Sequence, residues 1–338
     1  MTTMRAMVLA AVGAMRDRPE PLTPTRLPVP EPGAGQVRVR VLACGVCHTE
    51  LDEIEGRTAP PYLPVVPGHE VVGRIDRIGP GVDVGRLGER VGVGWIHHSD
   101  GTAEENVSPA FRATGRDVDG GYAEYMTVPS AYAFAIPERF SDVEAAPLLC
   151  AGAIGHRALR LASLRDGDGL GLMGFGGSAH LVLQLARHLY PRSKVAVFAR
   201  DADVQQFARG LGADWAGGTE DTPPFPLRAI IDTTPAWRPV VAALHRLAPG
   251  GRLVINAIRK EDADKSALLD LSYHDDLWLE REIKTVANIT GRDIAEFLPL
   301  AAAIPIRPTV TTYALEDANR ALRELREGRI KGAKVLVP

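Results

Sequence analysis

The sequence has 338 residues, which is enough for two domains, and its 45% hydrophobic and 24% charged fractions are ordinary for a globular protein. Its formal net charge is −3, without a basic stripe, so we expect no nucleic-acid partner. No apolar run approaches the length of a membrane span, which argues against a membrane partner. The short apolar run from Met7 to Met15 predicts a first strand rather than a signal peptide, and we expect a cytoplasmic protein.

The first third of the chain is rich in β-branched residues, glycine and proline. Polar and apolar residues alternate over Val37 to Ala43, as in a half-buried strand. Val71 to Ile78 and Arg90 to Val93 predict two further strands, separated by turn residues at Gly79 to Gly81. This part of the chain is therefore predicted to be a mostly β domain.

After Pro147 the pattern changes to strands that alternate with helices, which indicates βαβ units and a parallel sheet. The tail from Asp293 to Gly328 is predicted to be mostly helical, with a closing strand at Lys334 to Val337. The expected strands of the middle region are Leu170 to Met173, Lys194 to Phe198, Arg228 to Asp232 and Arg252 to Ala257; the expected helices are Ala179 to Leu189, Asp203 to Leu211 and Val240 to Leu247, with a turn at Pro249-Gly250-Gly251.

A glycine-rich segment that fits G-x-G-x-x-G/A, Gly174-Phe175-Gly176-Gly177-Ser178-Ala179, lies between a predicted strand and a predicted helix. That context favours a dinucleotide-binding turn over an ordinary glycine-rich turn. Gly174 would form the tight turn and Gly176 would let the backbone approach a pyrophosphate. The small Ala179 would let the helix pack closely on the strand, and the helix start would receive the anion.

The end of the second strand of this unit bears on the choice of cofactor. NAD-binding proteins usually carry a carboxylate there, whereas here Phe198 is followed by Ala199 and Arg200. A guanidinium with no carboxylate to repel a 2′-phosphate favours NADP. In the alternative, Arg200 is a solvated surface residue and Asp201 serves NAD.

The chain has three cysteines, an odd number that argues against a disulfide framework. In a reducing compartment such cysteines are metal ligands, nucleophiles or buried small side chains. Cys44 and Cys47 have the spacing of a redox pair, but no thioredoxin-like pattern surrounds them. Cys44 is therefore expected to be a buried small residue.

Three segments carry a specific resemblance: Cys44 to Glu50 (CGVCHTE), Gly68 to Gly73 (GHEVVG) continuing to Gly79 and Val82, and Leu148 to Gly152. They resemble the zinc-containing alcohol dehydrogenases of the medium-chain dehydrogenase/reductase superfamily, and the resemblance extends over essentially the whole chain. It implies an α/β protein with two domains: a GroES-like, mostly β catalytic domain over 1–151, completed by 290–338, and a Rossmann domain with a doubly wound parallel sheet over 152–289.

The resemblance also implies a ligand set for one catalytic Zn²⁺: Cys47, His69 and Cys150. Thiolates and imidazole suit zinc, and the fourth position would be left for substrate or water. Glu50 stands where the family usually has an aspartate that orients the ligand histidine; its extra methylene changes that geometry. Glu70 matches a glutamate that can approach the metal, the alternative being a plain buried carboxylate.

Further roles follow by position from the same resemblance. Thr49 matches the Ser/Thr that accepts the alcohol proton, and His48 matches a position that often meets the cofactor phosphates. Asp52 replaces the family's relay histidine, so the last proton step would use Asp52, His48 or water; otherwise Asp52 is an exposed loop acid. Trp95 would line the substrate pocket unless it is a core tryptophan. Arg292 would contact the cofactor unless it is an exposed residue at a helix start.

One departure from the family concerns a second, structural zinc, which many members bind through four cysteines. Gly94 to Gly121 contains no cysteine, and only Asp100 and Ser108 fall near two of those positions, so we predict one zinc per subunit. The adjacent His97 and His98 are expected to be solvated. The subunit is expected to form a homo-oligomer, a dimer or a tetramer, as family members do.

The predicted activity is zinc-dependent hydride transfer between a primary or secondary alcohol, or an aldehyde or ketone, and NADP(H) or NAD(H). A first alternative is a zinc-free enone or quinone reductase of the same superfamily, against which the intact set of Cys47, His69 and Cys150 argues. A second is a non-catalytic nucleotide-binding relative, which the changed residues Glu50 and Asp52 keep open.

Overall fold

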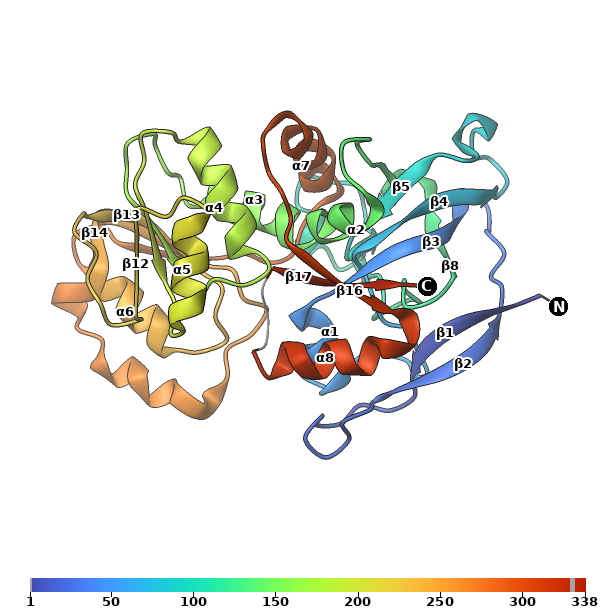
Figure 1. Ribbon diagram of the computed structural model, residues 1–338, viewed down its shortest axis with the longest axis horizontal. Helices are drawn as coiled ribbons and strands as arrows, with labels where there is room; N and C mark the ends of the chain where they lie inside the picture. Colours follow the sequence, from blue (N-terminus) through green and yellow to red (C-terminus); the bar gives the residue numbers. More distant parts are fainter. Residues whose placement is uncertain (1, 329–331) are drawn as a thin grey trace. The chain divides into compact units, whose positions relative to one another are not determined.

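The computed structural model describes residues 2–328 and 332–338 and divides into two compact units. The first unit comprises Met1–Ala153, Ile289–Ala302 and Arg307–Pro338, and the second comprises Ile154–Asn288 and Ala303–Ile306. Figure 1 shows a mostly β first unit and a second unit in which helices surround a sheet. Among the described residues, every helix is too short or too polar to cross a membrane.

A seven-stranded sheet forms the centre of the first unit, with the order β16-β17-β3-β4-β5-β9, and β8 also pairs with β3. The long strand β3 alternates as the sequence predicts: Val37, Val39 and Val41 are buried, whereas the residues between them are partly or fully exposed. The strands are β3 (Gln36–Val46), β4 (Val71–Ile78), β5 (Arg90–Val93), β8 (Tyr125–Pro129), β9 (Phe134–Ala135), β16 (Val310–Ala314) and β17 (Ala333–Val337).

The first strand differs from its prediction. β1 (Thr3–Leu9) begins before Met7 and ends well before Met15, because it pairs antiparallel with β2 (Leu22–Pro28) and the pairing ends at Leu9 opposite Leu22. β2 contains two prolines, which a two-stranded sheet tolerates at its outer edge but which hid this strand in the sequence. A second small sheet pairs β6 (Ile96–His98) with β7 (Arg112–Ala113).

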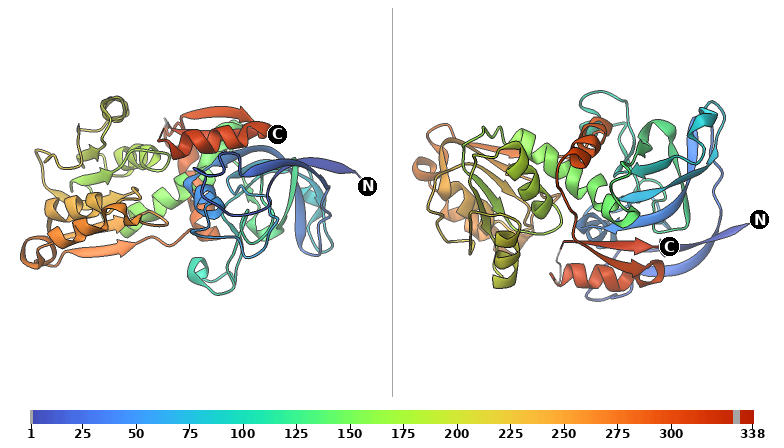
Figure 2. Two further views of the ribbon diagram at one scale, coloured as in Figure 1. Left: turned by 90° about the horizontal axis from the view of Figure 1, so that it is seen from below. Right: turned by 45° about the horizontal axis from the view of Figure 1, so that its top comes forward.

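The helices of the first unit are α1 (His48–Ile54), α2 (Asp142–Ala145), α7 (Gly291–Ala303) and α8 (Ala318–Arg326). The tail is helical at both ends but not throughout, because β16 lies between α7 and α8 and pairs parallel with β17. Figure 2 shows α8 lying alongside these two strands in both views. The predicted closing strand is confirmed as β17, one residue longer than predicted.

The second unit is a six-stranded, all-parallel sheet with the order β12-β11-β10-β13-β14-β15, which confirms the predicted Rossmann fold. Both β10 and β11 are buried on both faces, as central parallel strands should be. The strands are β10 (Leu170–Met173), β11 (Val195–Phe198), β12 (Trp215–Gly217), β13 (Leu227–Asp232), β14 (Leu247–Ile255) and β15 (Glu282–Thr285); the helices are α3 (Ala151–Leu161), α4 (Ala179–Leu189), α5 (Ala202–Gly210) and α6 (Arg238–Arg246).

Helix α6 packs on this sheet through buried residues that include Val240 and Leu244, against Ile230 and Leu253. One predicted turn is wrong: residues 249–251 lie within β14, where the pairing with β13 shifts register. Gly250 has a φ of 63°, so the glycine absorbs this irregularity without ending the strand. At the switch point, where the strand order reverses, the carboxyl ends of β10 and β13 lie side by side.

Candidate metal centre and nucleotide turn

Cys47 lies where β3 ends and α1 begins. It directly precedes the exposed His48, the first helical residue, and its backbone N–H donates to Glu50 Oε2 over 2.8 Å. The backbone N–H of the buried Thr49 donates to the Cys47 sulfur, and Thr49 Oγ1 lies 3.6 Å from Cys47 Sγ. Because N–H groups at a helix start stabilise a thiolate, this turn favours an ionised Cys47.

His69 is fully buried, and its Nδ1 lies 2.5 Å from Glu50 Oε1. Glu50 therefore contacts two candidate ligands at once, the His69 ring through one oxygen and the Cys47 backbone through the other. The longer side chain of glutamate thus spans the distance to the histidine. A carboxylate on one ring nitrogen fixes the orientation of the ring and leaves the other nitrogen for a ligand. The His69 side chain also hydrogen-bonds that of Cys47, so the buried ring is held between Glu50 and the first candidate ligand.

Cys150 ends the short helical turn η4 (Ala146–Leu149) and directly precedes α3. The neighbouring N–H of Ala151 donates to the buried carboxylate of Glu70. Glu70 occupies the space beside Gly45 in β3, where a Cβ would stand 1.8 Å from Glu70 Oε2. The glycine of the C-G-V-C segment is therefore required for the Glu70 carboxylate to reach this position.

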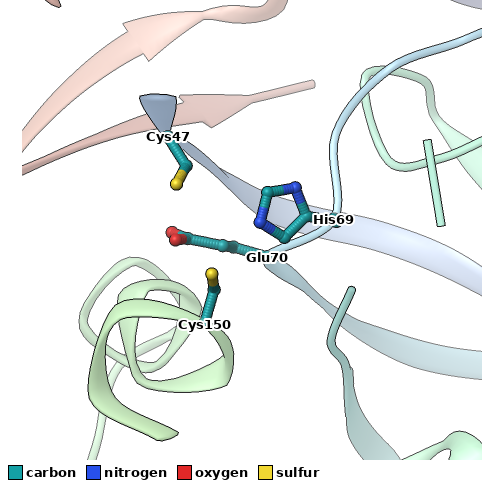
Figure 3. A group of neighbouring side chains, drawn as sticks. All are labelled: Cys47, His69, Glu70 and Cys150. Carbon is teal, nitrogen blue, oxygen red and sulfur yellow. The ribbon is translucent and has the colours of Figure 1, made fainter. Parts of the chain in front are cut away.

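The four side chains of Cys47, His69, Glu70 and Cys150 converge (Figure 3), and one ligand atom from each lies within 4.8 Å of all the others. The hydrogen bond with Cys150, followed by the effect of His69, holds the pKa of Cys47 well below its usual value, and the same hydrogen bond raises the pKa of Cys150. Burial alone would lower the pKa of His69, but Glu50 and Cys47 raise it overall. Two sulfurs, an imidazole and a carboxylate are a donor set that suits Zn²⁺.

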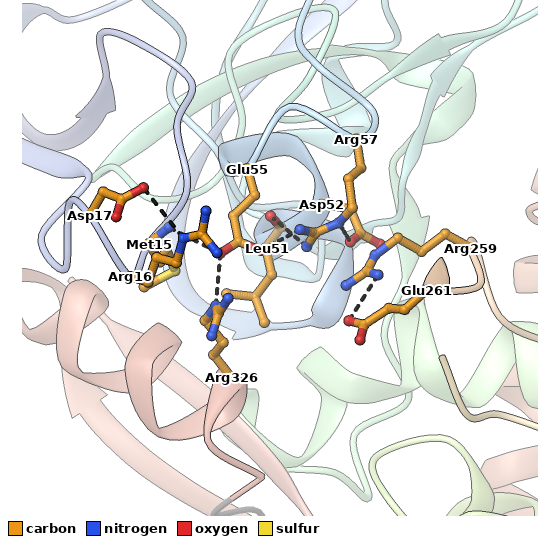
Figure 4. A network of polar contacts seen from close by, with 10 residues as sticks. All are labelled: Met15, Arg16, Asp17, Leu51, Asp52, Glu55, Arg57, Arg259, Glu261 and Arg326. Atoms are coloured by element: carbon orange, nitrogen blue, oxygen red, sulfur yellow. Dashed lines mark hydrogen bonds and ion pairs between the residues drawn. The ribbon is translucent and has the colours of Figure 1, made fainter. Parts of the chain in front are cut away.

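The remaining acidic side chains of this region have partners of their own (Figure 4). Asp52 is not an exposed loop acid: it is only 1% exposed, lies within α1, and its Oδ1 accepts from Arg57 Nε over 2.7 Å. At the end of α1, Glu55 Oε1 accepts from the backbone N–H of Met15 and from Arg326 Nε. The Glu55 contacts come from segments 40 and 271 residues away, which is why they could not be predicted from the sequence, whereas Arg57 is only five residues from Asp52.

Trp95 is half-buried between β5 and β6, and its ring centroid lies 6.2 Å from that of His69. Its indole Nε1 donates to Glu53, a buried residue of α1 that the sequence analysis missed. The spacing could have identified it, because Glu53 stands three residues after Glu50 and therefore lies on the same face of the helix.

The cysteine-free lobe from Gly94 to Gly121 contains a histidine pair that differs from its prediction. His97 is not solvated but only 4% exposed, and its Nε2 donates to the carbonyl of Thr127 over 3.2 Å. A carbonyl only accepts, so His97 Nδ1 must be the acceptor in its 2.9 Å contact with His98 Nδ1. Burial is the main cause that lowers the pKa of His97 to about 4.

In the second unit, the glycine-rich turn joins β10 to α4. Gly174 follows β10 directly and has a φ of 81°, a conformation that glycine adopts without strain. A Cβ at Gly176 would meet no atom within 4 Å, so the backbone there is open to a ligand. Gly177 and Ser178 are half-buried, and Ala179 is the buried first residue of α4.

At the end of β11, Ala199 is buried and Arg200 is exposed. The next residue, Asp201, accepts from the backbone N–H groups of Asp203 and Val204 and so caps the start of α5. The remaining predicted cofactor contact, Arg292, is an exposed residue in the first turn of α7 and pairs with Glu296 over 2.6 Å.

Comparison with known proteins places this architecture among enzymes. Residues 33–138 match the family model of the alcohol dehydrogenase GroES-like domain. The chain is 41% identical to a Mycobacterium tuberculosis protein named Probable alcohol dehydrogenase AdhA, over 99% of this chain and 97% of that protein. It is 34% identical to an alcohol dehydrogenase of Geobacillus stearothermophilus, covering 89% and 91%. The structure of a cinnamyl alcohol dehydrogenase from Sorghum bicolor superposes with a TM-score of 0.83 at 25% identity, covering 99% and 98% of the two chains.

Proposed function

Because this chain belongs to the alcohol dehydrogenase family of the medium-chain dehydrogenase/reductase superfamily, we propose that it is a zinc-dependent enzyme that transfers a hydride between an alcohol and NADP(H). The alcohol would be primary or secondary, and the reverse reaction would reduce an aldehyde or a ketone. The observation that carries the proposal is the convergence of Cys47, His69, Glu70 and Cys150, whose ligand atoms all lie within 4.8 Å of one another.

We assign one Zn²⁺ per chain to Cys47, His69 and Cys150, with Glu70 beside them. The fit rests on the chemistry of the donors: a thiol with a lowered pKa, a second thiol that shares its proton, and an imidazole oriented by Glu50. When bound, zinc would polarise the alcohol oxygen and the nicotinamide would exchange the hydride.

The chain's own residues would handle the proton. Thr49 Oγ1, buried beside the Cys47 sulfur, would take the proton of the alcohol, and the exposed His48 would pass it to solvent. We give Asp52 a smaller part than the sequence suggested, because one of its oxygens already accepts from Arg57.

The preference for NADP rests on the end of β11. Arg200 is exposed and available for a 2′-phosphate, whereas the nearest carboxylate, Asp201, is used to cap α5. Arg200→Gln is expected to raise the KM for NADPH by about 10- to 100-fold, the loss of one or two charge-assisted hydrogen bonds, and to leave the KM for NADH within about twofold. Equal effects on the two cofactors would overturn the preference.

The central experiment measures metal content and turnover together. Wild type is expected to bind about one zinc per chain and to oxidise members of an alcohol panel with NADP⁺, followed at the absorbance of the reduced cofactor. Cys47→Ser should lose both the metal and at least about 100-fold in kcat/KM, because a ligand is removed. The matched control, Cys44→Ala, alters a buried cysteine that is not a proposed ligand and should keep the metal.

Other outcomes would identify the alternatives. Full activity on enones or quinones after chelation would indicate the zinc-free reductase. Nucleotide binding without turnover of any alcohol or aldehyde would indicate the non-catalytic relative. The expected dimer or tetramer is measured on the same preparation by light scattering.

A further inference from the structure

A buried carboxyl group beside the candidate metal centre takes no part in the chemistry described so far. Glu53 lies in α1 and is only 1% exposed. Its Oε1 accepts from the indole Nε1 of Trp95 over 3.2 Å, and its Oε2 is buried without a hydrogen-bond partner. Burying a carboxyl group costs free energy unless its interactions repay that cost, so this contact requires an explanation.

The partner of this carboxyl is an aromatic side chain that lies close to a proposed metal ligand. The Trp95 ring is tilted by 56° to the ring of His69, at a centroid distance of 6.2 Å. On another side, Phe111 packs edge-to-face against it at 5.6 Å. The rings of His69 and Phe111 restrict the position of the indole, and the hydrogen bond to Glu53 restricts its rotation.

The ionisation of Glu53 agrees with this arrangement. Burial, followed by the neighbouring Glu50 carboxylate, raises the pKa of Glu53 well above its usual value. A neutral carboxyl group still accepts the indole N–H through its carbonyl oxygen. Glutamine has nearly the same shape and the same acceptor as this neutral acid, whereas leucine has a similar volume and no acceptor.

We propose that Glu53 is a specificity-determining positioning residue, which fixes the Trp95 indole beside the metal ligands and thereby sets the size of the alcohol that the site accepts. The proposal rests on the proposed function, because it assumes that alcohols react at the Cys47, His69 and Cys150 cluster. Glu53 acts through Trp95 and does not itself touch the reacting atoms.

The test compares Glu53→Leu, Glu53→Gln and Trp95→Phe on two substrates, ethanol and benzyl alcohol. In Glu53→Leu the ratio of kcat/KM for benzyl alcohol to that for ethanol is expected to change about tenfold, since small changes in pocket shape give discrimination of this order. Glu53→Gln should stay close to the wild-type ratio. Trp95→Phe cannot donate the hydrogen bond, so adding Glu53→Leu to it should cause no further change.

A second readout does not depend on turnover. The protein has four tryptophans, and Trp95→Phe identifies the indole N–H resonance of Trp95 in an NMR spectrum of labelled protein. That resonance should shift in Glu53→Leu and stay in place in Glu53→Gln. If Glu53→Leu does not fold, Glu53→Gln and Trp95→Phe are still compared with wild type, and a glutamine variant with the altered specificity of Trp95→Phe would overturn the proposal.

The remaining outcomes separate the two proposals. An unmoved Trp95 resonance in Glu53→Leu would overturn the positioning role, whatever the enzyme's activity. A resonance that moves while the substrate ratio stays the same would overturn the link to specificity. Wild-type protein that turns over no alcohol would instead overturn the proposed function, and with it the specificity claim, while the resonance would still report on the Glu53–Trp95 contact.

Discussion

Glu105 is expected to hold together the lobe that lacks structural-zinc cysteines. It lies in the helical turn η2 (Glu105–Val107) and is only 4% exposed. Its Oε2 accepts from the hydroxyl of Tyr132 over 2.7 Å, and its Oε1 accepts from the backbone N–H of Gly291 over 2.6 Å. Its backbone carbonyl accepts from Ser99 Oγ over 2.8 Å. One residue therefore joins the lobe to the start of α7.

The magnitude follows from what Glu105→Ala would leave behind. The Tyr132 hydroxyl and the Gly291 N–H would lose their acceptor while staying buried, at about 1–3 kcal/mol each. The expected loss in the free energy of unfolding is therefore about 2–6 kcal/mol. Glu105→Gln keeps one acceptor oxygen and loses the other, so it should cost about half as much.

Urea unfolding of the metal-loaded protein measures this difference, and amide hydrogen exchange at the first turn of α7 shows where protection is lost. Glu104→Ala is the matched control, since it alters the preceding, exposed residue and should change the free energy of unfolding by less than about 0.5 kcal/mol. If Glu105→Ala were no more destabilising than Glu104→Ala, the lobe would be held by other contacts and the reasoning would be refuted.

Two further predictions concern buried charge. Lys260→Met is expected to destabilise the protein by about 3–5 kcal/mol in thermal or urea unfolding, because Asp232 would lose its buried ion-pair partner; Lys265→Met, at an exposed ion pair, is the control. The pKa of His97 is lowered from 6.5 to about 4, so below pH 6.5 the unfolded chain binds the proton more readily than the folded chain. The contribution of His97 to the free energy of unfolding is complete above pH 6.5 and falls by about 3 kcal/mol as the pH is lowered to 4. In His97→Gln the free energy of unfolding should therefore depend less on pH over this range. A similar flattening in His188→Gln, at an exposed histidine, would contradict this assignment.

The sequence predicted secondary structure best where the local residue pattern alone determines a strand or a helix. The strands predicted at Val71 to Ile78 and at Arg90 to Val93 are found with those bounds, and so is the helix at Ala179 to Leu189. In each, a run of apolar or alternating residues is bounded by turn or cap residues, so local pattern and tertiary burial agree. The errors fall where a distant partner decides: β16 is a strand because it pairs with β17, and β1 ends where its pairing with β2 ends.

The candidate site shows the same division. Cysteine and histidine are uncommon and chemically specific, so the segments that contain Cys47, His69 and Cys150 stand out in the sequence itself. The absence of cysteine between Gly94 and Gly121 is equally visible in the sequence, and the prediction that no structural zinc is bound there rests on it. The contact between this lobe and the start of α7 could not be predicted, because Glu105 accepts from a backbone N–H 186 residues away, and every residue except proline has such a group. Sequence patterns can therefore predict a site that needs rare side chains such as cysteine and histidine. A contact with a backbone N–H, such as that of Glu105 with Gly291, can be identified only in the folded structure.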